Sequence, residues 1–182
     1  MQLRIDSKKS KKVTLYGIFL AYILVMGFIE RMIPMDGIAP GMRLGLANVV
    51  IVVSLYLFPA RDTFLLVILK CIITFMLSGS VMALLYSMSG SLASMIVMQL
   101  LLRAQGISPI GVSVAGAALH NIAQITVARL IFGTWGIFVY LPFLLAVGTV
   151  SGVLVGMLVK RIQRSAIWVI LASKSSKSVP SS

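Results

Sequence analysis

The amino-acid sequence predicts an all-α integral membrane protein with six transmembrane helices and both termini in the cytoplasm. Two observations carry this prediction: the apolar composition, and the position of the basic residues along the chain. Of 182 residues, 59% are hydrophobic and only 11% are charged, with a mean hydropathy of +1.06. In a soluble domain about a quarter of the residues are charged, so a soluble globular enzyme is excluded.

The basic residues give the orientation of the chain. Sixteen Lys and Arg stand against four acids, for a net charge of +12. On a soluble protein this imbalance would indicate nucleic-acid binding, but here the basic residues flank long apolar runs. Cytoplasmic loops of membrane proteins are enriched in Lys and Arg. We therefore expect the lipid bilayer, and no nucleic acid, as the partner of this surface.

The first three helices are expected to end at clear breakers. A spanning helix needs roughly 20 apolar residues. Pro34 and Pro40 interrupt the chain after the first apolar run, Pro59 stops the second, and Gly79 ends the third. The expected ranges are 13–33, 42–58 and 63–77.

The last three helices are bounded in the same way. Arg103 closes the fourth, Pro109 opens the fifth, Gly133 and Gly136 form a tight connection, and Lys160 stops the sixth. The expected ranges are 81–102, 110–132 and 137–159. The chain thus divides into a basic cytoplasmic arm (1–12), a transmembrane domain (13–164) and a partly disordered cytoplasmic tail (165–182).

An ionisable side chain inside the third helix is the clearest functional candidate. Lys70 is expected well inside the hydrocarbon, where a charge is costly and is retained mainly for function. The alternative is a structural lysine that extends toward the cytoplasmic surface or bonds a neighbouring helix.

The fifth helix is the most polar span. Its polar and small residues recur at helical spacing and share one face; they are Ser113, Ala117, His120, Gln124 and Ala128, with Asn121 and Arg129 beside them. Such a face lines a cavity or makes hydrogen bonds between helices. His120 is also a candidate proton carrier, and this leaves proton-coupled transport by the chain alone as an open hypothesis.

The first outer connection carries a further positive charge. Arg43 and Asn48 enter the second helix behind glycines that permit close backbone approach. Arg43, Arg129 and Lys70 together would give a positive cavity and favour a small anionic ligand. The alternative for Arg43 is an anchor at the lipid headgroups.

Several functions are excluded by missing motifs. There is no Walker motif for ATP, and the acids Asp6, Glu30, Asp36 and Asp62 form no cluster for a metal ion. We therefore expect no catalysis by this chain, no metal site and no cofactor. Gly148, Gly152 and Gly156 in the sixth helix are expected to let helices approach closely.

Four segments carry a resemblance to a known family. These are 40–48 (PGMRLGLAN), 86–91 (YSMSGS), 111–124 (GVSVAGAALHNIAQ), and 140–142 (YLP) followed by the glycines at 148, 152 and 156. They resemble the bacterial Gx transporter family, whose members are often labelled heptaprenyl diphosphate synthase component I. Arg43 stands where that family has lysine and Lys70 where it has arginine, so the positive charge is kept.

The resemblance implies a fold and a function. The family is similar to the substrate-binding S-components of energy-coupling factor (ECF) transporters, six-helix proteins of the bacterial cytoplasmic membrane. It implies a vitamin-, flavin- or isoprenoid-like ligand, a transmembrane coupling subunit and ATPase subunits as partners, and docking of that subunit at Gly17 and Ala21. We expect the ligand site to comprise Arg43, Asn48, Lys70, Tyr86, His120, Asn121, Gln124 and Arg129. The alternative is a non-catalytic membrane subunit of prenyl diphosphate or quinone synthesis.

Overall fold

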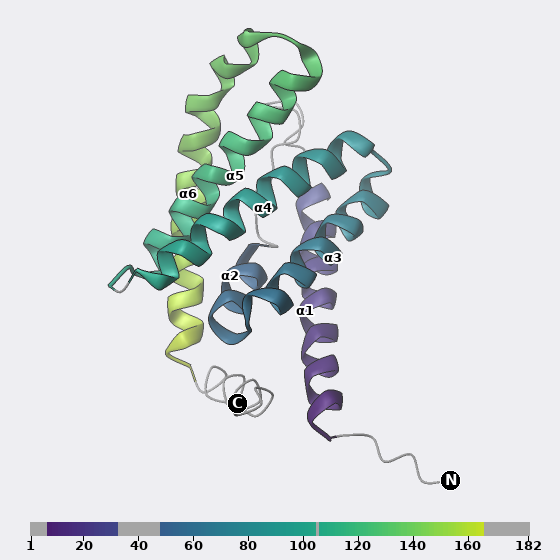
Figure 1. The fold of residues 1–182 in the computed structure, drawn as a ribbon, viewed down its shortest axis with the longest axis vertical. Coiled ribbons are helices and arrows are strands. Elements are labelled where there is room, and N and C mark those ends of the chain that lie inside the picture. The colour runs from purple at the N-terminus through teal and green to yellow at the C-terminus, as the bar shows by residue number, and fades with distance from the viewer. Residues whose placement is uncertain (1–6, 33–47, 105, 166–182) are drawn as a thin grey trace.

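The computed structural model describes residues 7–32, 48–104 and 106–165, and within these it leaves the side chains of residues 7–12, 30 and 31 undescribed. Every element in the described part is helical: six α-helices and one 3₁₀ helix (Figure 1). They are α1 (Ser7–Met32), α2 (Asn48–Leu57), α3 (Ala60–Ser78), α4 (Val81–Arg103), α5 (Pro109–Phe132), η1 (Trp135–Tyr140) and α6 (Leu141–Gln163).

The predicted all-helical fold is confirmed for the described residues. Three segments are long and apolar enough to cross a membrane: Val81–Arg103, Pro109–Phe132 and Trp135–Gln163. Two shorter apolar helices, Val13–Ile29 and Asn48–Leu57, accompany them. The six-span topology and the cytoplasmic termini stay predictions.

Four helix boundaries within the described residues differ from the predicted ones by three residues or more. Helix α3 begins at Ala60 rather than at residue 63, and α6 ends at Gln163 rather than at residue 159. The first helix begins at Ser7 rather than at residue 13, because lysine is a good helix former and extends the apolar helix through the end of the basic arm. The sixth helix was expected from residue 137, but residues Trp135–Tyr140 form a 3₁₀ helix first. Pro142 lies in the first turn of α6, where its missing N–H costs nothing.

Glycine and serine shape the connections between the long helices. Gly79 and Gly133 have φ angles of 64° and 69°, and their N–H groups donate to the last turns of α3 and α5. Glycine adopts this left-handed conformation without a steric penalty. Ser80 and Ser108 cap α4 and α5, each accepting a hydrogen bond from a backbone N–H three residues later. The glycines end α3 and α5, and the serines begin α4 and α5.

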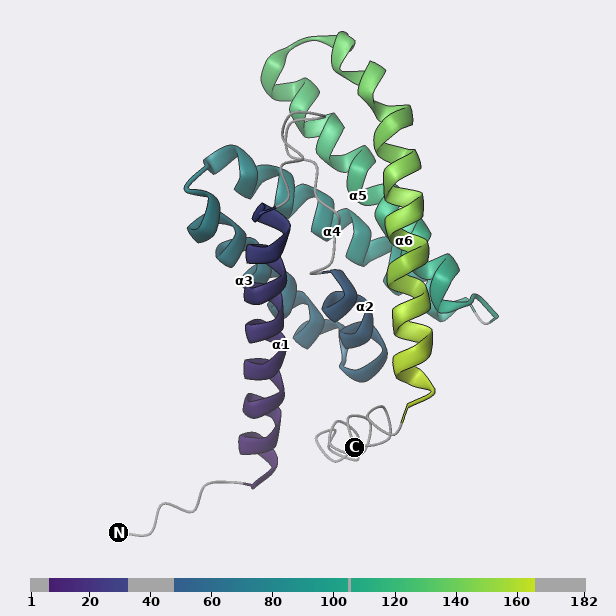
Figure 2. The ribbon, with the colours of Figure 1, turned by 180° about the vertical axis from the view of Figure 1, so that it is seen from behind.

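The short helix α2 lies at the centre of the bundle. Its side chains are buried along almost its whole length, from Val49 to Leu57, and it contacts α1, α3, α4 and α6. Helix α5 packs between α4 and α6, as both views show (Figures 1 and 2). Large apolar side chains such as Met76 and Val139 face outward, which suits a lipid environment.

The two ends of the molecule differ in composition. The first turn of α1 and the last turn of α6 lie at one end, and the connection from α5 to η1 lies at the opposite end (Figures 1 and 2). The last turn of α6 carries Lys160 and Arg161, whereas no charged residue occurs between Arg129 and Lys160 in the sequence.

Candidate functional site

A buried lysine forms the centre of the candidate site. Lys70 on α3 is only 7% exposed. Its Nζ donates to Asn48 Oδ1 at 2.6 Å and to Ser91 Oγ at 3.2 Å. The two acceptors come from α2 and α4, so the ammonium group joins three helices. We call Lys70, Asn48 and Ser91 the lysine cluster.

The cluster follows from the positions of two breaks in the chain. Pro59 lies midway between Asn48 and Lys70, and the Gly79 turn lies close to midway between Lys70 and Ser91. In an antiparallel helical pair, residues equidistant from the turn lie at the same height, since both helices rise 1.5 Å per residue. Lys70 therefore meets both partners at one level of the bundle.

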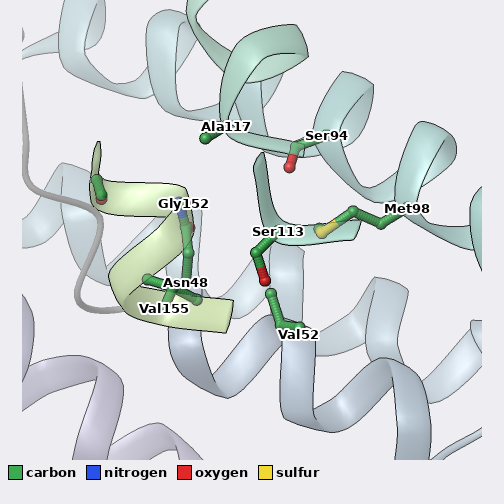
Figure 3. A pocket seen from close by; sticks show the side chains of 9 residues that line it. Asn48, Val52, Ser94, Met98, Ser113, Ala117, Gly152 and Val155 are labelled. Carbon is green, nitrogen blue, oxygen red and sulfur yellow. The ribbon is translucent and has the colours of Figure 1, made fainter. Parts of the chain in front are cut away.

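A small cavity adjoins the cluster through Asn48. It has a volume of about 20 Å³ and lies between α2, α4, α5 and α6 (Figure 3). A cavity of this size holds about one water molecule. It is lined by Asn48, Val52, Ser94, Met98, Ser113, Ala117, Ser151, Gly152 and Val155.

Ser113 gives the cavity its polar character. This side chain is 4% exposed, and its Oγ has no hydrogen-bond partner among the described residues. In Figure 3 the hydroxyl group points toward Val52 of α2. A buried hydroxyl without a partner costs about 1–3 kcal/mol, so a polar occupant of the cavity would be stabilised there.

His120 lies in the seam between α5 and α4. Its ring covers Gly90, and a Cβ at that glycine would lie 2.7 Å from ring atoms of His120. Gly90 precedes Ser91 of the lysine cluster, so the imidazole lies next to the cluster along α4. The absence of a side chain at Gly90 makes this close approach of ring and helix possible.

Asn121 faces a different helix from His120. Its Nδ2 donates to the backbone oxygen of Leu144 on α6 at 2.7 Å, and a Cβ at Gly148 would collide with the same amide. The structure therefore places Asn121 in a contact that holds α5 and α6 together. Asn121, a predicted ligand-site residue, therefore makes its main polar contact with a neighbouring helix.

Arg129 is not brought to the lysine cluster. Its Cζ lies 3.9 Å from the centre of the Trp135 ring, in a cation–π contact at the far end of α5. Along the helix axis Arg129 is about 24 Å from Ser113 at 1.5 Å per residue. Of the three basic residues expected to form a positive cavity, Lys70 is therefore the one that lies at this site within the described part of the chain.

The other predicted residues lie on α1, α4 and α5 or outside the described residues. Tyr86 and Gln124 are half-buried on α4 and α5, and Arg43 lies outside the described residues. Gly17 and Ala21 are exposed on α1, with open space beside Gly17; the docking role remains a prediction.

Serines were the residues that the sequence reasoning missed. Ser91, Ser94 and Ser151 are not among the site residues that the sequence predicts. The signal was available on α4, because Ser87, Ser91 and Ser94 recur at helical spacing and all three are buried. Within the described residues, no three His, Cys, Asp or Glu side chains gather where they could hold a metal ion.

Comparison with known proteins gives one match. The sequence model of the family described as heptaprenyl diphosphate synthase component I matches residues 19–162, which span α2 to α5 and most of α1 and α6. No curated protein and no solved structure matches the chain.

Proposed function

Because the chain belongs to the heptaprenyl diphosphate synthase component I family, we propose that it is a membrane subunit that binds a small anionic or amphipathic ligand. Specifically, it serves as the substrate-binding subunit of an ECF-type transporter for a vitamin-, flavin- or isoprenoid-like compound, as the resemblance to Gx transporters implies. A transmembrane coupling subunit and ATPases would be its partners.

The observation that carries this proposal is the buried ammonium group of Lys70. Asn48 and Ser91 supply neutral oxygens that accept hydrogen bonds from this ammonium group. Burying a charge costs several kcal/mol in real proteins, and intramembrane ionisable residues are retained mainly for function. A carboxylate or phosphate of the ligand would make use of this charge.

The distribution of acids supports a binding role over a catalytic one. Prenyl diphosphate synthases hold Mg²⁺ through aspartate-rich motifs, and the four acids of this sequence are isolated from one another. Asp62, the one whose side chain is described, lies in the first turn of α3, about 12 Å along the helix from Lys70. The chain is therefore proposed not to be an enzyme by itself.

The family description favours a second candidate. A non-catalytic membrane subunit of prenyl diphosphate synthesis would bind a lipid product with an anionic diphosphate group, for which Lys70 is equally suited. The two candidates differ in their partners. Co-purification with ATPases supports the transporter subunit, and co-purification with a soluble prenyltransferase supports the alternative.

Native mass spectrometry of the gently purified full-length chain tests the binding role. We expect a small-molecule adduct on the wild-type protein, and its loss in Lys70→Met. Lys160→Met is the matched control, because Lys160 is exposed at the end of α6. A Lys70→Met protein that unfolds at the wild-type temperature and keeps the adduct would refute the role of this lysine.

A further inference from the structure

The connection between α5 and α6 exposes an apolar surface around a single cation. We call residues 129–143 the hairpin tip. No residue of η1 is buried, and large apolar side chains face outward over the whole tip: Leu130, Phe132, Trp135, Val139, Tyr140 and Phe143. Arg129 is the one Lys, Arg, Asp or Glu between Arg103 and Lys160.

The guanidinium group of Arg129 is held against an aromatic ring, but its Nε lacks a hydrogen-bond acceptor among the described residues. Its contact within the described residues is the face of the Trp135 ring, at 3.9 Å. Its Nε is buried and has no hydrogen-bond partner there. An aromatic face attracts the cation but accepts none of its five N–H donors in the plane of the group. No described residue accepts a hydrogen bond from Nε, so the guanidinium group keeps donor capacity for an acceptor outside the described chain.

The length of α5 places the hairpin tip at the membrane surface. The helix has 24 residues and is therefore about 36 Å long, against a hydrocarbon thickness of about 30 Å. Lys160 and Arg161 lie at the opposite end of the α5–α6 pair (Figures 1 and 2). When Lys160 and Arg161 lie at one surface of the membrane, α5 is long enough for the hairpin tip to reach the lipid headgroups at the opposite surface.

We propose that the hairpin tip is a phospholipid-binding site in which Arg129 donates hydrogen bonds to the lipid phosphate. Guanidinium and phosphate match in geometry, because two parallel N–H groups can bind two oxygens of one phosphate. Trp135 holds the guanidinium against the tip, and the ring suits the boundary between acyl chains and water. The exposed apolar residues of η1 contact the acyl chains of the same lipid.

This inference is independent of the ligand site. It assigns Arg129 to the lipid, whereas the sequence placed it with the transported ligand, and it requires only that α5 and α6 span a membrane. Failure of ligand binding at Lys70 would leave it unaffected.

Fluorescence of Trp135 tests the proposal. The chain has two tryptophans, so Trp168→Phe leaves Trp135 as the single probe in the full-length protein. The delipidated, detergent-purified variant is titrated with dihexanoyl phosphatidylglycerol. We expect a saturable change in emission with the lipid and none with inorganic phosphate at equal concentration. Equal responses to both would overturn the lipid assignment in favour of a small-anion site.

Two arginine substitutions in that background identify the lipid-binding group. Arg129→Ala should weaken the lipid response at least tenfold, and Arg129→Lys should weaken it less. Arg103→Ala is the matched control, because Arg103 also lies in the last turn of a long helix and is exposed; it should titrate like its parent. Equal titrations of Arg129→Ala and Arg103→Ala would overturn the proposal.

The depth of Trp135 provides a second, separate test. In vesicles that contain brominated phosphatidylcholine, bromine near the ester end of the chain should quench Trp135 more strongly than bromine near the chain terminus. Stronger quenching from the terminus would place the tip in the bilayer centre and contradict a headgroup site.

Discussion

Replacing Gly152 by alanine should loosen the contact between α6 and α5. A Cβ at this position would lie 2.8 Å from the Cα of Val114, and 3.1 Å from the Val114 nitrogen and the Ser113 oxygen. The carbon–carbon distance is about 0.7–1.2 Å below the optimal separation. All three neighbours are backbone atoms, so no side-chain rotation can relieve the overlap and the two helices must separate.

The same substitution at Gly17 is the matched control. Nothing lies within 4 Å of a Cβ at Gly17, so only the helix-propensity gain of about 0.5–1 kcal/mol is expected there. Because both variants share that gain, their difference isolates the overlap, which costs about 1–3 kcal/mol in a packed interior. For a chain of this size the difference corresponds to about 2–12 °C in melting temperature.

Thermal unfolding in detergent, followed by circular dichroism of the purified chain, measures this difference. Gly152→Ala should melt below Gly17→Ala by an amount in that range. Identical melting temperatures would refute the reasoning, since they would mean that α5 and α6 are not in backbone contact at this glycine.

Three further predictions concern the same helices. Asn121→Leu should lower the free energy of unfolding by about 0.6–1.7 kcal/mol through loss of the interhelical bond, whereas Thr126→Val, which removes a hydroxyl bonded within its own helix, should have a smaller effect in the same melts. Ser113→Ala should lower the free energy of unfolding by about 1 kcal/mol, because a water molecule in the cavity would lose its hydrogen bond to this hydroxyl; a rise in the melting temperature would show that the cavity is dry and contradict this prediction. Gly90→Ala should be destabilising and should be rescued by His120→Ala, with a coupling energy of at least about 0.5 kcal/mol in a double-mutant cycle; additive effects would contradict the ring-on-glycine contact.

The lysine cluster shows how far the sequence alone could lead. The breaks at Pro59 and Gly79 are evident in the sequence, and Lys70 stands out as a charge in an apolar run. Counting outward from Pro59 identifies Asn48 as the residue at the height of Lys70, and counting from Gly79 leads to within one helical turn of Ser91. The sequence positions do not give the rotation of each helix about its own axis. This rotation decides whether the side chains of Asn48, Lys70 and Ser91 come into contact.

Asn121 shows a limit of the same kind. It follows His120 directly, so the pair was interpreted as one polar site. Consecutive helical residues point about 100° apart at 3.6 residues per turn, and here one side chain faces α4 and the other faces α6. The periodicity predicted the polar face of α5 but not which neighbour each side of that face would meet.

Arg129 could not have been placed from periodicity at all. Its partner Trp135 lies in η1, a short 3₁₀ helix where the sequence predicted a tight turn leading into the sixth helix. Hydrophobic patterns distinguish long helices well but carry little information about one or two turns at a connection. The resulting cation–π contact holds Arg129 at the connection between α5 and α6, away from the lysine cluster.

The cavity beside the lysine cluster has two walls of different stiffness. On one side, Gly152 brings the backbone of α6 against that of α5, and this wall yields only if whole helices move. On the other side, Met98 of α4 lies over Gly116, where its unbranched, polarizable side chain can change rotamer at low cost. We therefore expect any enlargement of the cavity to begin at Met98, so that the conformation of one thioether, rather than the packing of the bundle, limits the size of a group beside Asn48.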